Sequence, residues 1–247
     1  MNNFFAAFAW LVDPAHLVGA DGIPARVGEH VGYTLLTLVI AAAIALPAGL
    51  AIGHTGHGKT IAVQLSGGLR SLPTLGLVTL LGVAIGIGLL PPLIALVILA
   101  LPPILAGAYA GLEAVDRTII DAARAVGMTE WQILITVEIP LAAPLIIGGI
   151  RSAALQVIAT WTVAAILPLG GLGRYIYDAI PVLDYTQMLA GSILVTALAL
   201  AVDGLFALIQ KFVVPRGVVA GRVAEVRVKT SRRRPAAGAA LSNNQSS

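Results

Sequence analysis

Residues 53–60 (GHTGHGKT) fit the GxxxxGK(S/T) pattern of a phosphate-binding loop, in which backbone N–H groups and a lysine hold nucleotide phosphates. Residues 198–203 (LALAVD) likewise match the apolar stretch ending in aspartate that accompanies such loops. The chemistry needs a β-strand before the loop and a helix N-terminus directed at the phosphates. Here a long uncharged apolar segment, residues 31–53, precedes the loop, and Asp203 lies inside another apolar run. We therefore predict that residues 53–60 form a polar turn and bind no nucleotide.

His54 and His57 lie in this same turn, three residues apart. Imidazole is a common ligand of zinc and other transition metals, but a site needs further His, Cys, Asp or Glu ligands. None stands nearby in the sequence, and the chain has no cysteine. We predict solvated histidines and no metal or cofactor, and we find no HExxH motif or membrane Ser/His pair that would indicate an enzyme.

Arg151 and Asp203 are charges within apolar segments. An unpaired charge at the centre of a membrane helix costs about 2.5–3.5 kcal/mol on insertion scales. If their helices run antiparallel, both residues lie roughly 15 Å from the same membrane face, at ~1.5 Å per helical residue. We hypothesise an Arg151–Asp203 ion pair; the alternative is that each side chain faces an aqueous pathway separately.

The surrounding composition is that of an integral membrane protein. Hydrophobic residues make up 58% of the 247 residues, charged residues 11%, and the mean hydropathy is +0.93. Because about 20 apolar residues span a bilayer as a helix, we predict an all-α membrane protein with about five transmembrane helices. They cover residues 31–53, 71–90, 93–113, 141–167 and 187–213, and residues 61–70 either extend the second span or lie along the surface, broken near Pro73.

Charge distribution predicts the orientation. Eight of the 15 Lys and Arg residues lie beyond Phe206, and cytoplasmic segments carry the excess of positive charge. We expect residues 1–30 to be an extracytoplasmic segment that begins with a short interfacial helix, residues 31–213 to be the transmembrane domain, and residues 214–247 to be a basic, disordered cytoplasmic tail. A nucleic-acid-binding arm is the less favoured interpretation of the tail.

A polar island, residues 121–140 (DAARAVGMTEWQILITVEIP), interrupts the apolar runs on the cytoplasmic side. The pattern predicts two short helices joined at Gly127, where a left-handed backbone conformation closes the first helix. Thr129 is placed to cap the second helix, in which Trp131, Leu134 and Ile135 form an apolar stripe that Pro140 ends. Such an amphipathic projection suits docking into a groove on a soluble partner.

The island resembles the cytoplasmic "EAA" loop of the permeases of binding-protein-dependent ABC importers. The match consists of Asp121-Ala122-Ala123, Gly127, Val137, Ile139 and Pro140 at the family spacing, with Asp for Glu, Val for Ile and Ile for Leu as departures. The resemblance implies the type I importer permease fold with cytoplasmic coupling helices. It also implies that a separate ABC ATPase subunit docks on this loop. The coupling residues would be Asp121, Ala122, Ala123, Gly127, Trp131, Val137, Ile139 and Pro140.

Three flanking stretches narrow the resemblance to permeases for quaternary-amine osmoprotectants: glycine betaine, carnitine, choline or proline betaine. They are residues 70–77 (RSLPTLGL), 101–111 (LPPILAGAYAG) and 161–173 (WTVAAILPLGGLG), within a similarity over about residues 30–216. The implied partners are an ATPase, an extracytoplasmic substrate-binding protein and a second, identical or paralogous permease chain in the lipid bilayer. Import of methionine, a sulfonate or another small solute is the main alternative, and a stand-alone secondary transporter is less favoured because no internal repeat is visible.

Residues 168–173 (PLGGLG), here called the glycine loop, follow the fourth predicted span on the outer side. Backbone of this composition stays in a membrane protein only where protein covers it or a cavity lies beside it. An outer gate or a contact for a binding protein is one interpretation, and a flexible connection is the other. The preceding Trp161 could face a quaternary ammonium group, although packing is the more frequent role. The candidate pathway residues are Trp161, Pro168, Gly170, Gly171 and Gly173.

Overall fold

The computed structural model describes residues 2–213, and all regular secondary structure in this range is helical. Four segments are long and apolar enough to cross a membrane: α2 (Ile23–Thr55), α5 (Leu90–Glu113), the segment Glu130–Ala164 that ends with α8 (Ile139–Ala164), and α10 (Tyr185–Val213). A fifth crossing results if the bent pair α3 (Lys59–Arg70) and α4 (Thr74–Ile85) is one span. The prediction of an all-α membrane protein with about five spans is confirmed. The predicted basic tail, residues 214–247, lies outside the described residues.

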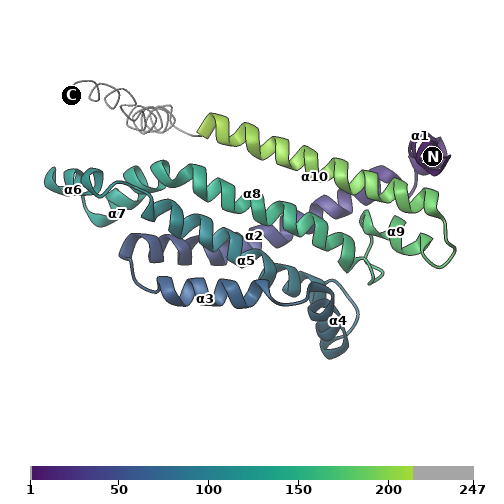
Figure 1. Ribbon diagram of the computed structural model, residues 1–247, viewed down its shortest axis with the longest axis horizontal. Helices are drawn as coiled ribbons and strands as arrows, with labels where there is room; N and C mark the ends of the chain where they lie inside the picture. The colour runs from purple at the N-terminus through teal and green to yellow at the C-terminus, as the bar shows by residue number, and fades with distance from the viewer. Residues whose placement is uncertain (1, 214–247) are drawn as a thin grey trace, which may run out of the picture.

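The central layer consists of α2, α5 and α8, with α10 along α8 and α3 along α5 (Figure 1). Small residues allow the close contacts of α5 with its neighbours. A Cβ on Gly53 of α2 would lie 2.7 Å from the Cβ of Leu112, and a Cβ on Gly107 of α5 would lie 2.7 Å from the Cα of Gly149 in α8. Such close approach of backbones is how membrane helices gain van der Waals contact.

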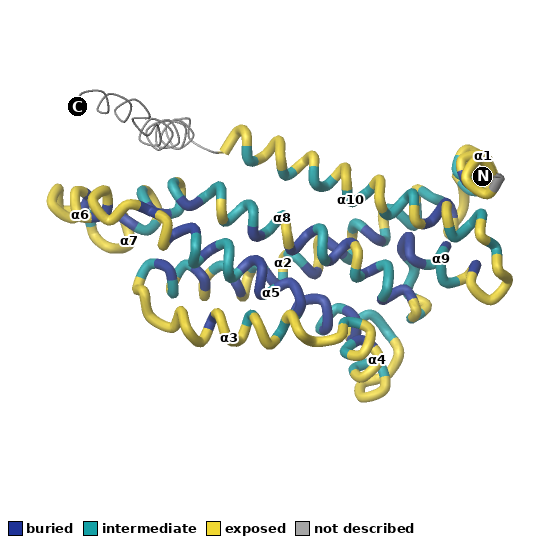
Figure 2. Tube along the Cα trace, in the orientation of Figure 1, coloured by how far each residue is buried: buried dark blue, intermediate teal, exposed yellow. Residues whose placement is uncertain are grey.

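Buried residues concentrate in this central layer, whereas α3, α4, α6 (Arg117–Ala125) and α10 are largely exposed (Figure 2). The main apolar cluster includes Ala41, Leu96, Ile104, Val157 and Trp161. The first long helix begins at Ile23, eight residues before the predicted span, so the last part of the predicted N-terminal segment belongs to α2.

The prediction that residues 71–90 form a single span is wrong. The chain turns by 83° between α3 and α4, and α4 ends at Ile85, where Gly86 has a φ of +97°. Pro73 explains the turn, because a proline disfavours helical conformation in the residue before it and donates no backbone hydrogen bond. Residues 61–70 lie in α3, which runs beside α5 (Figure 1).

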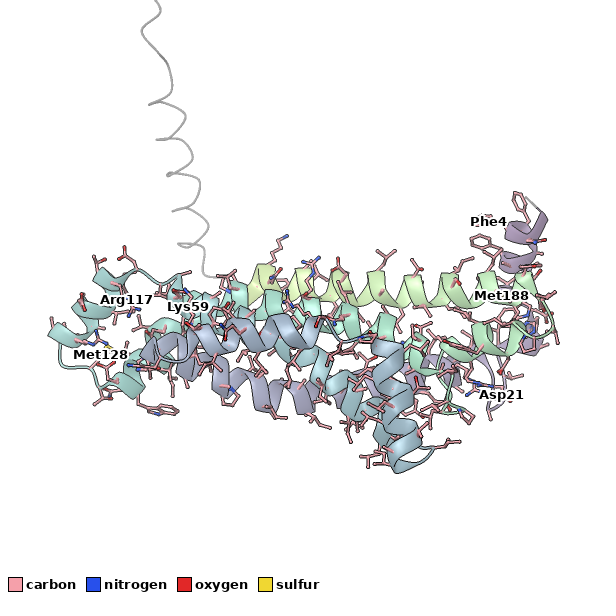
Figure 3. The ribbon with its side chains drawn as sticks, turned by 60° about the horizontal axis from the view of Figure 1, so that its bottom comes forward. Phe4, Asp21, Lys59, Arg117, Met128 and Met188 are labelled. Atoms are coloured by element: carbon pink, nitrogen blue, oxygen red, sulfur yellow. The ribbon has the colours of Figure 1, made fainter. Side chains whose placement is uncertain are left out.

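The molecule is elongated, and different parts of the chain form its two ends (Figure 3). Lys59, Arg117 and Met128 lie at one end, here the island end, and Phe4, Asp21 and Met188 lie at the other. The island end contains α6, α7 (Glu130–Ile133) and a π-helical turn, Leu134–Glu138. The opposite end contains α1 (Asn2–Val12), a short 3₁₀ turn, Pro14–His16, and α9 (Gly173–Ala179), which follows the glycine loop (Figure 1).

Candidate functional site

The island folds as two capped helices. Asp116 caps α6 by accepting the backbone N–H of Thr118, a hydrogen bond that lowers the pKa of this carboxyl. At the other end of α6, the N–H of Gly127 bonds to the carbonyl of Arg124 and the N–H of Met128 to that of Ala123, while Gly127 has a φ of +86°. This pair of bonds is a Schellman motif, which satisfies the last carbonyls of the helix.

Thr129 begins the second helix through a capping box. Its hydroxyl accepts the N–H of Gln132, and the Gln132 side chain accepts the N–H of Thr129. Two boundaries differ from the prediction. The first helix starts at Arg117 rather than Asp121, and Pro140 does not stop the second. The helical segment continues through the π-helical turn into α8.

The π-helical turn accounts for the tolerance of Pro140. Proline within an α-helix clashes with the carbonyl four residues earlier and lacks an N–H. In this turn the N–H of Ile139 bonds to the carbonyl of Leu134, five residues back, so the backbone is wider just before Pro140. α7, the π-helical turn and α8 are therefore one continuous helical element.

The island exposes apolar side chains that no described residue covers. Trp131 is 68% and Val126 78% exposed. Together with Ile119 and Ile135, which are also exposed, they form what we call the island patch. Of the predicted stripe, Leu134 is half-buried, and Ile133 is the fully buried member of α7.

The predicted coupling residues divide between surface and interior. Asp121, Ala122, Gly127 and Pro140 are exposed, Val137 and Ile139 are half-buried, and Ala123 is buried. Ala123 packs with Ile120, Ile133, Leu112 and Ala142 in a second apolar cluster. The island is therefore fixed to α5 and α8 by its inner face and presents its outer face freely.

A chain of polar contacts also fixes the island to α2, and the sequence interpretation missed it. Arg124 donates to both carboxylate oxygens of Glu130, at 2.8 and 3.0 Å. Glu130 Oε2 lies 3.5 Å from His54 Nε2, and His54 Nδ1 lies 2.5 Å from Oε2 of Glu138. Glu138 is only 2% exposed and stands in the π-helical turn. The prediction of a solvated His54 is therefore wrong, because its ring lies between two glutamates from the island.

The phosphate-loop pattern has no phosphate-binding geometry. α2 rather than a strand precedes it and ends at Thr55, and Gly56 and Gly58 have positive φ values of 73° and 84° on either side of His57. Lys59 Nζ lies 2.5 Å from Glu113 Oε1 and ties the start of α3 to the end of α5. His57 is exposed, and no group of three or more potential metal ligands occurs within residues 2–213.

Arg151 and Asp203 face each other across α8 and α10. Both guanidinium nitrogens Nε and Nη2 donate to the Asp203 carboxylate at 2.6 Å, a bidentate arrangement. Gln210, two turns further along α10, bonds to the carbonyl of Pro144 in α8 at 3.1 Å. These polar contacts attach α10, which is largely exposed, to α8.

At the opposite end, the structure buries Trp161 and the second half of the glycine loop, residues 171–173. Trp161 is 4% exposed, stacks on Tyr33 with ring centroids 4.9 Å apart, and donates to Thr37 Oγ1 at 3.0 Å. In this conformation the indole is therefore buried, with one face against Tyr33 and its N–H bonded to Thr37. Pro168 is exposed, Gly170 is half-buried, and Gly171 and Gly173 are buried.

Comparisons with known proteins agree with this architecture. Residues 45–216 match the family model described as the binding-protein-dependent transport system inner membrane component. One chain of a solved structure of the MetNI methionine ABC transporter in an inward-facing conformation has the same fold, with a TM-score of 0.68 at 23% identity. That match covers 77% of this chain and 95% of the MetNI chain.

Curated relatives cover most of both sequences. The glycine betaine/carnitine/choline transport system permease protein OpuCB of Bacillus subtilis (strain 168) is 30% identical over 78% of this chain and 89% of its own length. The carnitine transport permease protein OpuCB of Listeria monocytogenes is 32% identical over 77% and 87%. The osmoprotectant import permease protein OsmW of Salmonella typhimurium is 32% identical over 77% and 91%. This chain is a multi-pass membrane protein that belongs to the family of inner membrane components of binding-protein-dependent transport systems.

Proposed function

We propose that this chain is the membrane-spanning subunit of an ATP-driven importer for quaternary-amine osmoprotectants such as glycine betaine, carnitine and choline. The assignment of the solute class rests on the similarity to permeases named for these solutes. This similarity extends over more than three quarters of the chain. The methionine transporter shares the fold, but its lower identity supports no assignment of solute.

The island patch is the proposed contact for a separate ATPase subunit. Its exposed apolar side chains project from an end of the bundle where the described chain offers them no partner. A hydrophobic centre with polar surroundings is typical of a protein–protein interface, and exposed tryptophan is a frequent energetic anchor. Asp121, Ala122, Gly127 and Trp131 would contact the ATPase, whereas Ala123, Val137 and Ile139 would transmit force inward through their packing.

The continuous helix from Glu130 to Ala164 provides the mechanical connection. Movement of the island on ATPase closure must displace α8, because no flexible joint separates them. His54 and Glu138 would carry the same displacement to α2. Two states of the bundle, biased by ATP on one side and by a loaded binding protein on the other, then constitute alternating access.

The orientation follows from this assignment. The island end would face the cytoplasm, consistent with Lys59, Arg117 and Arg124 there, and the N-terminus would lie outside. A second permease chain, identical or paralogous, would complete the pathway, since α10 has a largely exposed apolar surface in the single chain. The permease itself would hydrolyse no ATP.

Uptake of labelled solutes by cells lacking the gene tests the assignment. Under high salt we expect loss of glycine betaine, carnitine or choline uptake, its return with the intact gene, and no return with Gly127→Asp, which would place a negative charge in the proposed ATPase contact. Uptake of labelled methionine and of a labelled sulfonate is measured in parallel. Unchanged uptake of all quaternary amines, with loss of methionine or sulfonate uptake, would replace the proposed solute class while keeping the importer.

A further inference from the structure

The glycine loop is held against α2 by three side chains from one face of that helix. Glu29 Oε2 accepts the N–H of Gly171 at 2.8 Å. His30 Nδ1 accepts the N–H of the next residue, Leu172, at 3.3 Å, and the hydroxyl of Tyr33 donates to the carbonyl of Leu169 at 2.6 Å. Main-chain groups on both sides of Gly170 are thus bound by residues more than 130 positions away in sequence.

His30 connects this loop to a third element. It is 1% exposed, and its Nε2 lies 3.1 Å from the carbonyl oxygen of Ile158 in α8. Because Nδ1 accepts a hydrogen bond from the N–H of Leu172, Nε2 must carry the proton and donate to the carbonyl of Ile158, so the network assigns one neutral tautomer. A single ring therefore joins α2, α8 and the loop, and its protonation on Nδ1 would remove the acceptor.

The loop backbone is shaped to fit these side chains. Gly170 and Gly171 have φ values of +94° and +77°, which L-residues rarely adopt. A Cβ on Gly170 would collide with the Glu29 carboxylate, and one on Gly171 would lie 3.3 Å from His30 Nδ1. Glu29 is itself fixed, because its Oε2 also accepts from Arg26 Nη1 at 3.0 Å. The conformation favours glycine at both positions, and at Gly170 the space requires it as well.

We propose that Glu29, His30 and Tyr33 form a clasp that holds the glycine loop closed at the end opposite the island, and that this clasp must open when solute enters. In this proposal the glycine loop is the gate, and the three side chains position it. The proposal rests on the assignment as an importer permease. It adds that the closed state is held by a few polar bonds to loop backbone, which can exchange for water when the loop moves.

Cysteine labelling of the intact transporter, reconstituted with its ATPase and binding protein, tests the clasp. The permease has no native cysteine, so Leu172→Cys introduces a single thiol at a fully buried loop position. We expect slow reaction with a membrane-impermeant maleimide in this parent without ATP. His30→Leu, which removes both ring bonds, should raise the rate on the order of tenfold, since each net hydrogen bond shifts an opening equilibrium several-fold.

Three variants separate the clasp from general loosening. His30→Gln keeps a donor and an acceptor and should restore slow labelling. Tyr33→Phe keeps the stack on Trp161 but loses one bond, so it should label about fivefold faster than the parent even if His30→Leu fails to assemble. The hydroxyl of Thr34 bonds only to the carbonyl of His30 in the same helix. Thr34→Val should therefore label at the same rate as the parent.

ATP with loaded binding protein should increase the labelling rate of the parent. In His30→Leu it should increase the already fast labelling rate only slightly. Equal rates in the parent, His30→Leu and Tyr33→Phe, or equal acceleration by Thr34→Val, would overturn the clasp. Uptake measured on the same vesicles separates the two proposals: the labelling pattern can hold with no quaternary-amine uptake, in which case only the solute assignment fails.

Discussion

His54 Nδ1 lies 2.5 Å from Glu138 Oε2, joining the last turn of α2 to the π-helical turn that precedes α8. Two helices of the central layer are thereby linked beside the island, where a force from a partner would enter. The pair is buried on the Glu138 side, so it cannot readily exchange its contact for water.

Removing one partner of this pair should cost stability and coupling. His54→Ala leaves the buried Glu138 carboxylate without its ring partner, which we expect to destabilise the protein by about 1–3 kcal/mol. Glu138→Gln retains a hydrogen-bond acceptor and should cost less. Thermal unfolding in detergent measures the loss of stability, and stimulation of the ATPase by loaded binding protein measures the loss of coupling. An additive double-mutant cycle for His54→Ala and Glu138→Ala would contradict a direct interaction.

The island patch should determine ATPase affinity with little effect on permease folding. Trp131→Ala removes the largest exposed apolar side chain, and we expect at least about tenfold weaker association, as for other interface anchors. Thr136 is a nearby exposed residue whose hydroxyl bonds only within its own helical segment. Thr136→Ala is therefore the matched control. Binding of purified ATPase to permease in nanodiscs provides the measurement. Wild-type affinity for Trp131→Ala would exclude the patch as the docking surface.

Within the permease itself, the stability of the turn at Gly127 should depend on backbone conformation and not on side-chain volume. Nothing lies within 4 Å of a Cβ built at this position, and its φ is +86°. Gly127→Ala should therefore destabilise the turn by about 1 kcal/mol, through left-handed strain alone. Gly127→Asn should cost less, because asparagine tolerates that conformation. Unfolding temperatures of the isolated permease in the order Gly, Asn, Ala are expected, and equal values for the Asn and Ala variants would argue against backbone strain.

Several of these features could be predicted from local sequence. The cap at Thr129 and the turn at Gly127 depend on residues a few positions apart, so their patterns are visible in the chain itself. Long apolar runs likewise revealed four of the five predicted spans, all but the second. The opposite charges of Arg151 and Asp203 at equal membrane depth suggested that they meet, and in the structure they do.

Other features depend on tertiary packing and left no readable pattern. His54 and Glu138 are 84 positions apart, and they meet only because α2 packs against α8 as well as α5 in the folded chain. Pro140 was expected to end a helix, yet the wider π-helical turn before it removes the clash. His30 and Glu29 were assigned to an N-terminal segment, and only the folded chain shows them bonded to the glycine loop.

The Arg151–Asp203 pair should respond to charge exchange. Arg151→Asp or Asp203→Arg alone places two like charges together between α8 and α10, so we expect a severalfold loss of assembled transporter and of uptake. The exchanged double variant should recover part of both, because opposite charges face each other again. Gel-filtration yield and uptake give the two readouts. A double variant no better than either single variant would show that the residues act separately.

ATP-dependent solute uptake by proteoliposomes tests the central claim most directly. The vesicles should contain the permease pair and ATPase, with binding protein outside and ATP enclosed. We predict accumulation of labelled glycine betaine, carnitine or choline that requires both ATP and binding protein, and that falls at least about tenfold with Trp131→Ala. Accumulation that proceeds equally without ATP, or without the ATPase subunit, would contradict the account.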